Sequence, residues 1–516
     1  MQVMPMTRVG TVEVTADGEG LVSHAGVALL VELADRAGLT AALSDALAST
    51  RERRSAHDPG RVLRDVAVML ADGGDCVTDN DAYHGQQRLF GARASETTTH
   101  RVLKSVDQQL LAQIRAARGI ARARVWNAGA RPATITLNID ATLLTAHSEK
   151  DRAAGNYKHG YGFHPLGCWL DETGEALAAI LRPGNAGSNT AADHFTVLGL
   201  ALAQLPAEDL DREILVRTDI GGQTHAFTAD CRDAGIRFSV GYELNDTVRQ
   251  TILDLPETVW VQAINAGAEN RDGAWVAELT DDIDLSAWPE GSRLIVRRER
   301  PHPGAQFQIF DEHGYRHTCF LTDQDGNDIA VLELRHRGRA RVEDSIRSGK
   351  DTGMRNLPHY AFEHNQTWLE LSLIAQDLLC WTKLICLTGK LARAEPKQLR
   401  QTAAYRRQAR ASRPPDPSQA RPRLALVRSA RRRLHPAASE PRALLNARRL
   451  RRRDPDDELC GTTRLACPKN DRERPRSSNH HRPSGCSSPR RGSSPAHSPA
   501  ATDNTVTITT ITAHRG

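Results

Sequence analysis

The sequence lacks the features that mark a secreted, membrane-spanning or zinc-stabilised protein. Its nine cysteines include no C-x-x-C pair, which fits a reduced cytosolic protein better than a disulfide scaffold or a zinc module. The opening residues, MQVMPMTRVG, contain no apolar signal-peptide core. The most apolar stretch, residues 368–387, is interrupted by Glu370, Gln376, Asp377 and Lys383, which predicts a packing helix rather than a membrane span. We therefore expect a cytoplasmic protein with no membrane partner.

The chain also lacks an even distribution of positive charge. Residues 401–516 carry 25 Lys and Arg against 9 Asp and Glu, a net charge of +16, whereas residues 1–400 have a net charge of −11. The overall charge of +5 therefore comes from one end of the chain. A polyanionic partner cannot be inferred from this balance alone, so the case for nucleic acid must rest on particular sites.

That basic end, which we take as residues 396–516, is rich in Arg, Pro, Ser and Ala. After residue 400 its only aromatic residue is Tyr405 and its only lysine is Lys469. Such a composition buries too little apolar surface to offset chain entropy, which predicts disorder. It is either a native nucleic-acid-binding arm or the out-of-frame product of a frameshift in a GC-rich gene. The abrupt change in composition, with no linker, favours the frameshift.

The remaining chain is long enough for several domains. Apolar residues recur at helical spacing over residues 25–50 and 61–73, and Ser95 is a candidate N-cap for a third helix. We therefore expect residues 1–130 to form a helical N-terminal domain. It either reads DNA, with Arg101 and Lys104 facing the duplex, or serves as a scaffold or dimerisation element.

After this domain the pattern changes to that of an α/β protein. Alternating or apolar runs predict strands ending near Asp140 and at 167–170, 175–181, 213–218 and 236–242, with helices over 189–205 and 223–234. This order predicts a mixed sheet in residues 131–249. Short alternating runs broken by Gly, Asn, Asp and Pro predict an all-β insertion over 250–332. Helical spacing returns at 335–347 and 365–387, so the second part of the α/β core is expected over 333–395.

Three acidic residues stand where two-metal phosphodiester chemistry requires them. Asp140 ends the strand LNID, Asp219 ends the strand ILVRTD, and Glu343 lies on the helix after the insertion. Two Mg²⁺ ions need hard oxygen ligands that converge from separate elements, typically strand ends and a facing helix. Gly221 and Gly222 allow the backbone to turn after Asp219. The alternative is that each Asp caps a turn or helix and that Glu343 is a solvated surface residue.

The helix that carries Glu343 places further charges at regular offsets. Relative to Glu343 these are His336 at −7, Arg339 at −4, Arg347 at +4 and Lys350 at +7, which lie on one face of a regular helix. Cations around one carboxylate suit a face that meets a phosphate backbone, with Glu343 on the metal. A surface ladder of ion pairs is the alternative.

These residues resemble those of DDE transposases from bacterial insertion sequences. The string His336-x2-Arg339-x3-Glu343-x6-Lys350 is similar to their Y-R-E-K signature, and LNIDATLL and ILVRTDIGG are similar to their first-Asp and second-Asp strands. The segments NYKHGYGFHPLG and LRPGNAGSNTAADH resemble insertion-sequence family thirteen-eighty in particular. The resemblance covers about residues 5–400.

The resemblance implies a ribonuclease H-like catalytic domain with a β-strand insertion between the second Asp and the Glu. It implies cleavage at terminal inverted repeats and strand transfer into target DNA, with two Mg²⁺ ions for which Mn²⁺ can substitute. Carried over by position, Asp140, Asp219 and Glu343 are the metal ligands, and Arg339 and Lys350 contact phosphate. Two alternatives remain open: a catalytically silent DNA-binding remnant, and a metal-dependent nuclease without strand transfer.

The sequence departs from the family pattern at three places. His336 replaces the signature tyrosine, which changes its reach and its response to pH. DIGG lacks the aromatic residue expected after the second Asp, and the tail does not resemble the family's usual ending. Lys158 and Arg182, near two glycine-rich turns, are further candidate DNA contacts. The expected partners are DNA, both element ends and target, and a second copy on that DNA, in the nucleoid, with no small-molecule substrate.

Overall fold

The computed structural model describes residue 24 and residues 26–51, 56–301, 304 and 313–405, all of which belong to one compact unit. The choice between a native arm and a frameshift concerns residues outside this described part. Among the described residues, no helix combines the length and the apolar character needed to cross a membrane.

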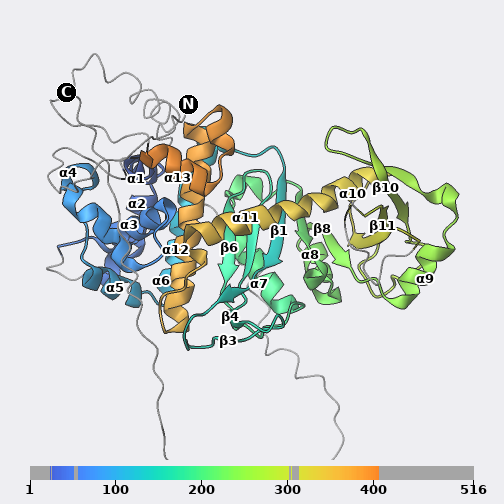
Figure 1. Cartoon of the computed structure of the whole chain (residues 1–516), viewed down its shortest axis with the longest axis horizontal. Coiled ribbons are helices and arrows are strands. Elements are labelled where there is room, and N and C mark those ends of the chain that lie inside the picture. Colours follow the sequence, from blue (N-terminus) through green and yellow to red (C-terminus); the bar gives the residue numbers. More distant parts are fainter. Residues whose placement is uncertain (1–23, 25, 52–55, 302–303, 305–312, 406–516) are drawn as a thin grey trace, which may run out of the picture. The chain divides into compact units, whose positions relative to one another are not determined.

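Helices make up the described part of residues 24–130 (Figure 1). They are α1 (Val27–Arg36), α2 (Leu39–Ala46), η1 (Ala48–Thr50), α3 (Pro59–Asp72), η2 (Val77–Gln86), α4 (Gln87–Phe90), α5 (Glu96–Lys104), α6 (Gln108–Val125) and η3 (Trp126–Ala130). The predicted cap at Ser95 is confirmed, because its hydroxyl accepts the backbone N–H of Thr98 at 3.4 Å. Asp58 caps α3 in the same way and accepts from the N–H of Arg61 at 3.0 Å.

A nine-stranded mixed sheet follows, in the order β6-β5-β1-β7-β8-β12-β11-β10-β9. The parallel pairs are β1 with β7 and β7 with β8, and the other neighbours are antiparallel. The five strands predicted in residues 131–249 are confirmed as β1 (Ile135–Ala141), β5 (Leu166–Leu170), β6 (Ala176–Ile180), β7 (Ile214–Thr218) and β8 (Arg237–Tyr242). A separate small sheet in the glycine-rich segment contains β2 (Leu144–Thr145), β3 (Ala154–Gly155) and β4 (Tyr161–Phe163).

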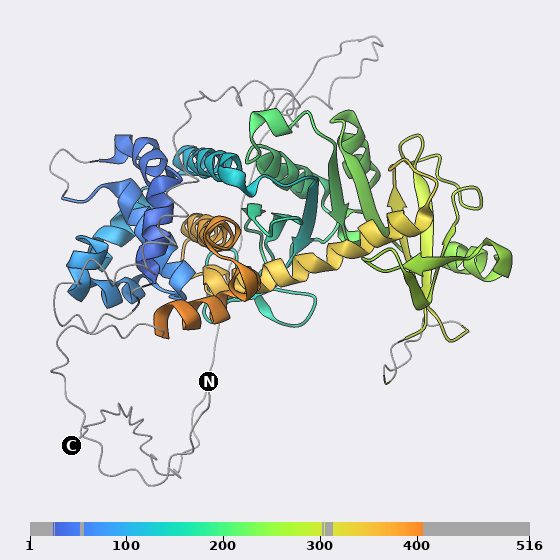
Figure 2. The same cartoon turned by 90° about the horizontal axis from the view of Figure 1, so that it is seen from above.

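Helices cover both faces of the large sheet. The two predicted helices are confirmed as α7 (Ala191–Leu202), which contacts β5 and β6, and α8 (His225–Asp233), which contacts β8; η4 (Ala207–Asp209) and η5 (Ile220–Gly222) lie between them. On the other face runs a long helical segment of α10 (Ile329–Arg337), η7 (Gly338–Ala340) and α11 (Arg341–Gly349). Figure 2 shows the sheet between these two sets of helices.

The segment predicted as an all-β insertion departs from that prediction in two ways. It contains helical residues, because α9 (Asp246–Asp254) extends into it and η6 (Glu257–Val259) follows. Its strands do not form a sheet of their own, because β12 pairs with β8 and so continues the sheet of the α/β core. These strands are β9 (Val261–Ile264), β10 (Asn270–Glu278), β11 (Arg293–Glu299) and β12 (Arg316–Thr322).

The chain after the long helical segment returns to the N-terminal helices. After η8 (Lys350–Met354), α12 (Phe362–Trp381) packs against α3 and β6, and η9 (Thr382–Cys386) and η10 (Gly389–Arg393) follow. Helix α13 (Pro396–Tyr405) corrects the predicted start of the tail at residue 396. Arg400 holds α13 in place by donating to the carbonyl oxygens of Ala71 and Asp351 at 2.8 and 2.7 Å.

A buried ion network joins the N-terminal helices to the sheet through α12. Arg122 of α6 donates to Glu175, just before β6, at 3.0 Å and also to Asp377 of α12. Arg118 of α6 pairs with Glu370 of α12 at 2.7 Å. Their side chains are at most 1% exposed. Burial raises the pKa of Asp377 to about 6, against the opposing effect of the two arginines. Glu370 and Asp377, two of the polar residues that interrupt the apolar stretch of residues 368–387, therefore form ion pairs in the core.

Removing one member of this network should destabilise the fold strongly. Asp377→Ala removes an acceptor from Arg122, which keeps its pair with Glu175, and from the backbone N–H of Ala176; two buried donors left unsatisfied cost about 2–6 kcal/mol together. The free energy of unfolding, measured by urea denaturation, should fall by that amount. Asp325→Ala is the control, because Asp325 also pairs with an arginine, Arg237, but is 84% exposed. Equal losses in the two variants would contradict this account of the network.

Candidate active site

Asp140 and Asp219 lie side by side because their strands are adjacent and parallel. In the register of β1 and β7, Ile139 is paired with Thr218, and each aspartate is the next residue along its strand direction. Parallel neighbours carry their carboxyl ends to the same edge of the sheet. The sequence prediction that both residues lie at strand ends is therefore confirmed, because Asp140 is the second-last residue of β1 and Asp219 directly follows β7.

The turn after Asp219 depends on two small residues. The side chain of Asp219 accepts the backbone N–H of Gly221 at 2.9 Å. A Cβ atom at Gly222 would lie 2.1 Å from Thr218 Oγ1, and one at Gly221 would lie 2.9 Å from Asp219 Oδ1. Neither glycine has the left-handed backbone that favours glycine, so close packing is the reason for both.

Glu343 on α11 belongs to the same electrostatic environment. Helix α11 packs against β1. Burial and the Asp219 carboxylate raise the pKa of Asp140 to about 6, and Glu343 contributes in the same direction. Arg339, in the short η7 turn before α11, opposes them by donating to Asp140 Oδ2 at 3.2 Å. Asp219 and Glu343 therefore both act against the charge of Asp140, and Arg339 partly neutralises it.

This donor set suits a hard divalent cation. Carboxylate oxygens are the ligands that Mg²⁺ and Mn²⁺ prefer, and a cation would relieve the repulsion that raises the pKa of Asp140. Among the described residues, the group whose ligand atoms all lie within 4.8 Å of one another is Asp75, Cys76 and Asp79, not the three carboxylates. In that group Asp79 caps η2 by accepting the backbone N–H groups of Asp75 and Cys76, which is a structural role.

His336 is buried, whereas the regular spacing predicts it on a surface that faces DNA. Its ring is 9% exposed, stacks on Phe320 at 4.4 Å and contacts Ser239 Oγ through Nδ1 at 2.9 Å. Both partners come from strands of the large sheet, Phe320 from β12 and Ser239 from β8. In this structure His336 packs in the core and offers no surface to a phosphate.

The other cations predicted to contact DNA differ in exposure. Lys350 is half-buried, and its pKa is lowered by burial and by the nearby charges of Arg355 and Lys158. Lys158 is exposed. Because its charge acts on Lys350, these two predicted contacts lie near each other. Arg347 is exposed but pairs with Asp344 and Glu395 at 2.7 and 3.2 Å.

Arg182 is only 4% exposed and has a structural set of partners. It donates to the carbonyl oxygen of His164 at 2.9 Å and to Asp193 at 3.1 Å. Its guanidinium thus ties the LRPGNAG turn to α7, which leaves it little surface for DNA. Arg101 and Lys104 are exposed on α5.

Four residues beneath the carboxylates were not found from the sequence. Asn138, Asp171, Arg217 and Arg341 form a polar network in which Asp171 bonds to the other three. Three of them stand two residues before Asp140, Asp219 and Glu343. That spacing is visible in the sequence, but only the pairing of the strands shows that these residues meet in one network.

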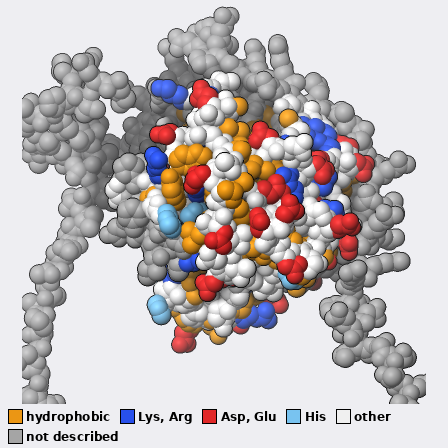
Figure 3. Space-filling model, turned by 90° about the vertical axis from the view of Figure 1, so that its right-hand side faces the viewer, with side chains coloured by type: hydrophobic (Ala, Val, Ile, Leu, Met, Phe, Trp, Pro, Cys, Tyr) orange, Lys and Arg blue, Asp and Glu red, His pale blue; other side chains and the backbone are white. Residues whose placement is uncertain are grey.

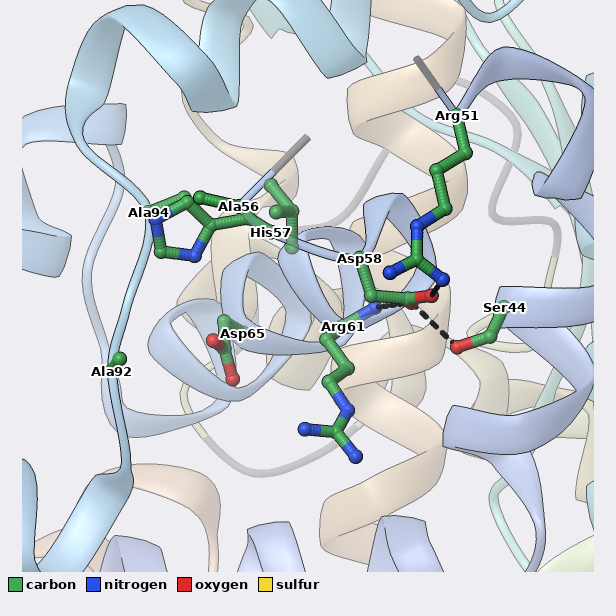
Figure 4. A pocket seen from close by; sticks show the side chains of 10 residues that line it. Ser44, Arg51, Ala56, His57, Asp58, Arg61, Asp65, Ala92 and Ala94 are labelled. Atoms are coloured by element: carbon green, nitrogen blue, oxygen red, sulfur yellow. Dashed lines mark hydrogen bonds and ion pairs between the residues drawn. The ribbon is translucent and has the colours of Figure 1, made fainter. Parts of the chain in front are cut away.

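Two other regions carry no sign of the predicted site. A cavity of about 550 Å³ lies among the N-terminal helices and is lined by residues between Ser44 and Ala94, none of which comes from the sheet (Figure 4). There Asp58 is already bonded to Ser44 and paired with Arg51. On the end of the molecule formed by α9, β10 and β11, described acidic, basic and hydrophobic side chains are intermixed without one continuous basic area (Figure 3).

Comparisons with known proteins place the chain in a family. The family model described as "Transposase DDE domain group 1" matches residues 5–402. No curated protein matches the chain. Among solved structures, the chain is similar to the piggyBac transposase in its synaptic complex with hairpin DNA, studied by cryo-EM. That likeness has 9% sequence identity and a TM-score of 0.37, and covers 83% of this chain and 88% of that one.

The burial of His336 predicts acid sensitivity. Burial and three neighbouring arginines lower its pKa to about 3, so the folded protein keeps it neutral, whereas an unfolded histidine takes up a proton near pH 6.5. Stability is therefore lost as the pH falls below 6.5. Between pH 7 and pH 5 the loss from this group should be about 2 kcal/mol. Urea denaturation at both values should show that His336→Gln loses less stability on acidification than wild type. The exposed His147 provides the control, His147→Gln, and an unchanged loss in His336→Gln would contradict the assignment.

Proposed function

Because the chain belongs to the transposase DDE domain group 1 family, we propose that it cleaves DNA at the terminal inverted repeats of its own element and transfers the strands into target DNA. The observation that supports this most is that Asp140 and Asp219 lie at the ends of two adjacent parallel strands; burial and Asp219 raise the pKa of Asp140, and Glu343 adds a smaller effect in the same direction. The proposal includes a ribonuclease H-like catalytic domain and an origin in insertion-sequence family thirteen-eighty.

In this proposal Asp140, Asp219 and Glu343 hold two Mg²⁺ ions, and Mn²⁺ can substitute. Bound there, such ions activate the attacking oxygen and stabilise the leaving oxygen of the scissile phosphate. Arg339 has two tasks: it balances the charge of Asp140, to which it now donates, and it offers its other N–H groups to phosphate oxygens. The carboxylate of Asp140 is only 14% exposed, so water screens it less than a surface carboxylate and its attraction for a cation is stronger.

The cations predicted to contact phosphate extend the site to the DNA backbone. Lys158 and Lys350 lie near each other, and Arg347 follows Glu343 by one helical turn. Arg101 and Lys104 on α5 are a second group, which would bind the element ends. We further propose that two copies act together on DNA, because both ends of an element have to be joined, and that the protein works in the cytoplasm on the nucleoid.

Substitution of Asp219 tests the catalytic assignment. Asp219→Asn keeps the size of the side chain but removes the charge that attracts a divalent ion, so cleavage of a DNA carrying the inverted repeats should fall below detection in Mg²⁺ or Mn²⁺. Binding of that DNA should persist. Asp272→Asn is the matched control, because Asp272 is another exposed aspartate on the same sheet, in β10.

The outcomes of that experiment separate the alternatives. Full cleavage by Asp219→Asn would overturn the assignment of the site. A wild-type protein that binds the repeats and never cuts them is a silent remnant. Cleavage without preference for the repeats, and without joining, indicates a nuclease.

Substitution of Lys350 tests the contact with the DNA backbone. Lys350→Ala should weaken binding similarly for all sequences and reduce the slope of log K against log salt concentration by about 1, because one phosphate contact is lost. Arg271→Ala is the control, since it removes the same charge from an arginine that Glu299 already neutralises. Fluorescence anisotropy over a range of salt concentrations measures both. A slope identical to that of wild type would exclude Lys350 from the interface.

A further inference from the structure

We propose that Asp171 is a positioning residue, which fixes the spacing of the three candidate metal ligands through one shared carboxylate. This inference rests on the proposed function of Asp140, Asp219 and Glu343. Asp171 follows β5 in the turn to β6, and its side chain is 7% exposed. Its backbone N–H donates to the carbonyl oxygen of Thr136 at 2.9 Å, so the turn is fixed to β1.

The first connection runs to Asp140. Asn138 stands two residues earlier in β1, on the same face of the strand, and is 1% exposed. Its amide nitrogen donates to Asp171 Oδ1 at 3.0 Å. The strand that ends in Asp140 is thereby held by a side chain as well as by the ladder of the sheet.

The second connection runs to Asp219. Arg217 stands two residues earlier in β7 and is 3% exposed. It pairs with Asp171 Oδ1 at 2.9 Å and donates to Asn138 Oδ1 at 2.9 Å. It also donates to the carbonyl oxygen of Arg335 in α10. One buried guanidinium thus joins both strands to the long helical segment.

The third connection runs to Glu343. Arg341, the first residue of α11, stands two residues earlier and donates through Nε to Asp171 Oδ1 at 3.0 Å and through a second nitrogen to Oδ2. The two-point contact fixes the start of the helix over the sheet. All three ligands are therefore two residues from a group bonded to Asp171.

Gly338 shows how closely the helical segment must approach this network. A Cβ atom there would lie 2.6 Å from Arg217 Nη1 and 3.0 Å from Arg341 Nη2. The backbone of Gly338 is not left-handed, so glycine fits here because it has no side chain. A larger residue would displace the guanidinium groups of the two arginines that hold Asp171.

A positioning role and a purely stabilising role predict different results. If Asp171 positions the ligands, its substitution must lower metal affinity more than an equally destabilising substitution elsewhere. Carboxylates that repel one another bind a cation tightly only when they are held at the correct distance, and groups behind the ligands typically change affinity by about 10–100-fold. A control with the same chemistry is available in Asp209, which is 1% exposed and accepts from Arg131 and Arg212, each at 2.8 Å.

The test compares Asp171→Asn with Asp209→Asn by calorimetric titration with Mn²⁺, together with thermal unfolding. Wild type and Asp219→Asn define the Mn²⁺ binding that depends on the three carboxylates. Asp171→Asn should weaken that binding by about 10–100-fold, whereas Asp209→Asn should keep wild-type affinity even where it lowers the melting temperature as much. Affinity within twofold of wild type in Asp171→Asn would overturn the proposal.

A second pair of variants covers the case in which Asp171→Asn does not fold. Gly338→Ala should also weaken Mn²⁺ binding, while Gly199→Ala, in α7 with open space around its Cβ position, should not. Equal affinity in these two would contradict the inference. DNA cleavage is measured separately: Mn²⁺ binding that depends on Asp171 in a protein that never cuts DNA refutes the proposed function and leaves the positioning role intact. A wild-type protein whose Mn²⁺ binding does not depend on Asp219 refutes the positioning role.

Discussion

The repulsion between neighbouring carboxylates is the constraint on which the surrounding structure depends. Asp140 is pushed to a pKa of about 6 by burial, by Asp219 and by Glu343, so the fold must supply forces that keep these groups together. The ladder between β1 and β7 supplies one of them, and the ion pair from Arg339 supplies another. Carboxylates that act against one another in this way cost stability, which a bound cation would offset.

The same constraint explains why the long helical segment is built as it is. It packs α11, which carries Glu343, against β1 and leaves room for the buried Arg217, which donates to the carbonyl oxygen of Arg335. A glycine and a 3₁₀ turn at Gly338–Ala340 provide that room and place Arg339 next to Asp140. At a greater distance, the buried pairs between α6, Glu175 and α12 hold the helical N-terminal part against the sheet. The charges in these buried pairs are therefore balanced by partners of opposite sign.

Much of this arrangement could be predicted from the sequence, for physical reasons. Apolar strands that end in an acid were recognisable at Asp140 and Asp219, and the helical spacing around Glu343 indicated its element. The burial of His336 could not be predicted, because it depends on packing against Phe320 and Ser239, which lie on distant strands of the sheet. Asp171 and Arg217 escaped notice because their partners are distant in sequence. The strands after Ile264 were expected, but their continuation of the main sheet depends on the pairing of β12 with β8.

The central claim is that Asp140, Asp219 and Glu343 share divalent cations, and anomalous scattering from crystals soaked in Mn²⁺ tests it most directly. The account predicts anomalous peaks whose nearest protein atoms are carboxylate oxygens of all three residues, and loss of those peaks in Asp219→Asn. Peaks confined to other acidic groups, such as Asp75 and Asp79, or none near the ends of β1 and β7, would contradict it.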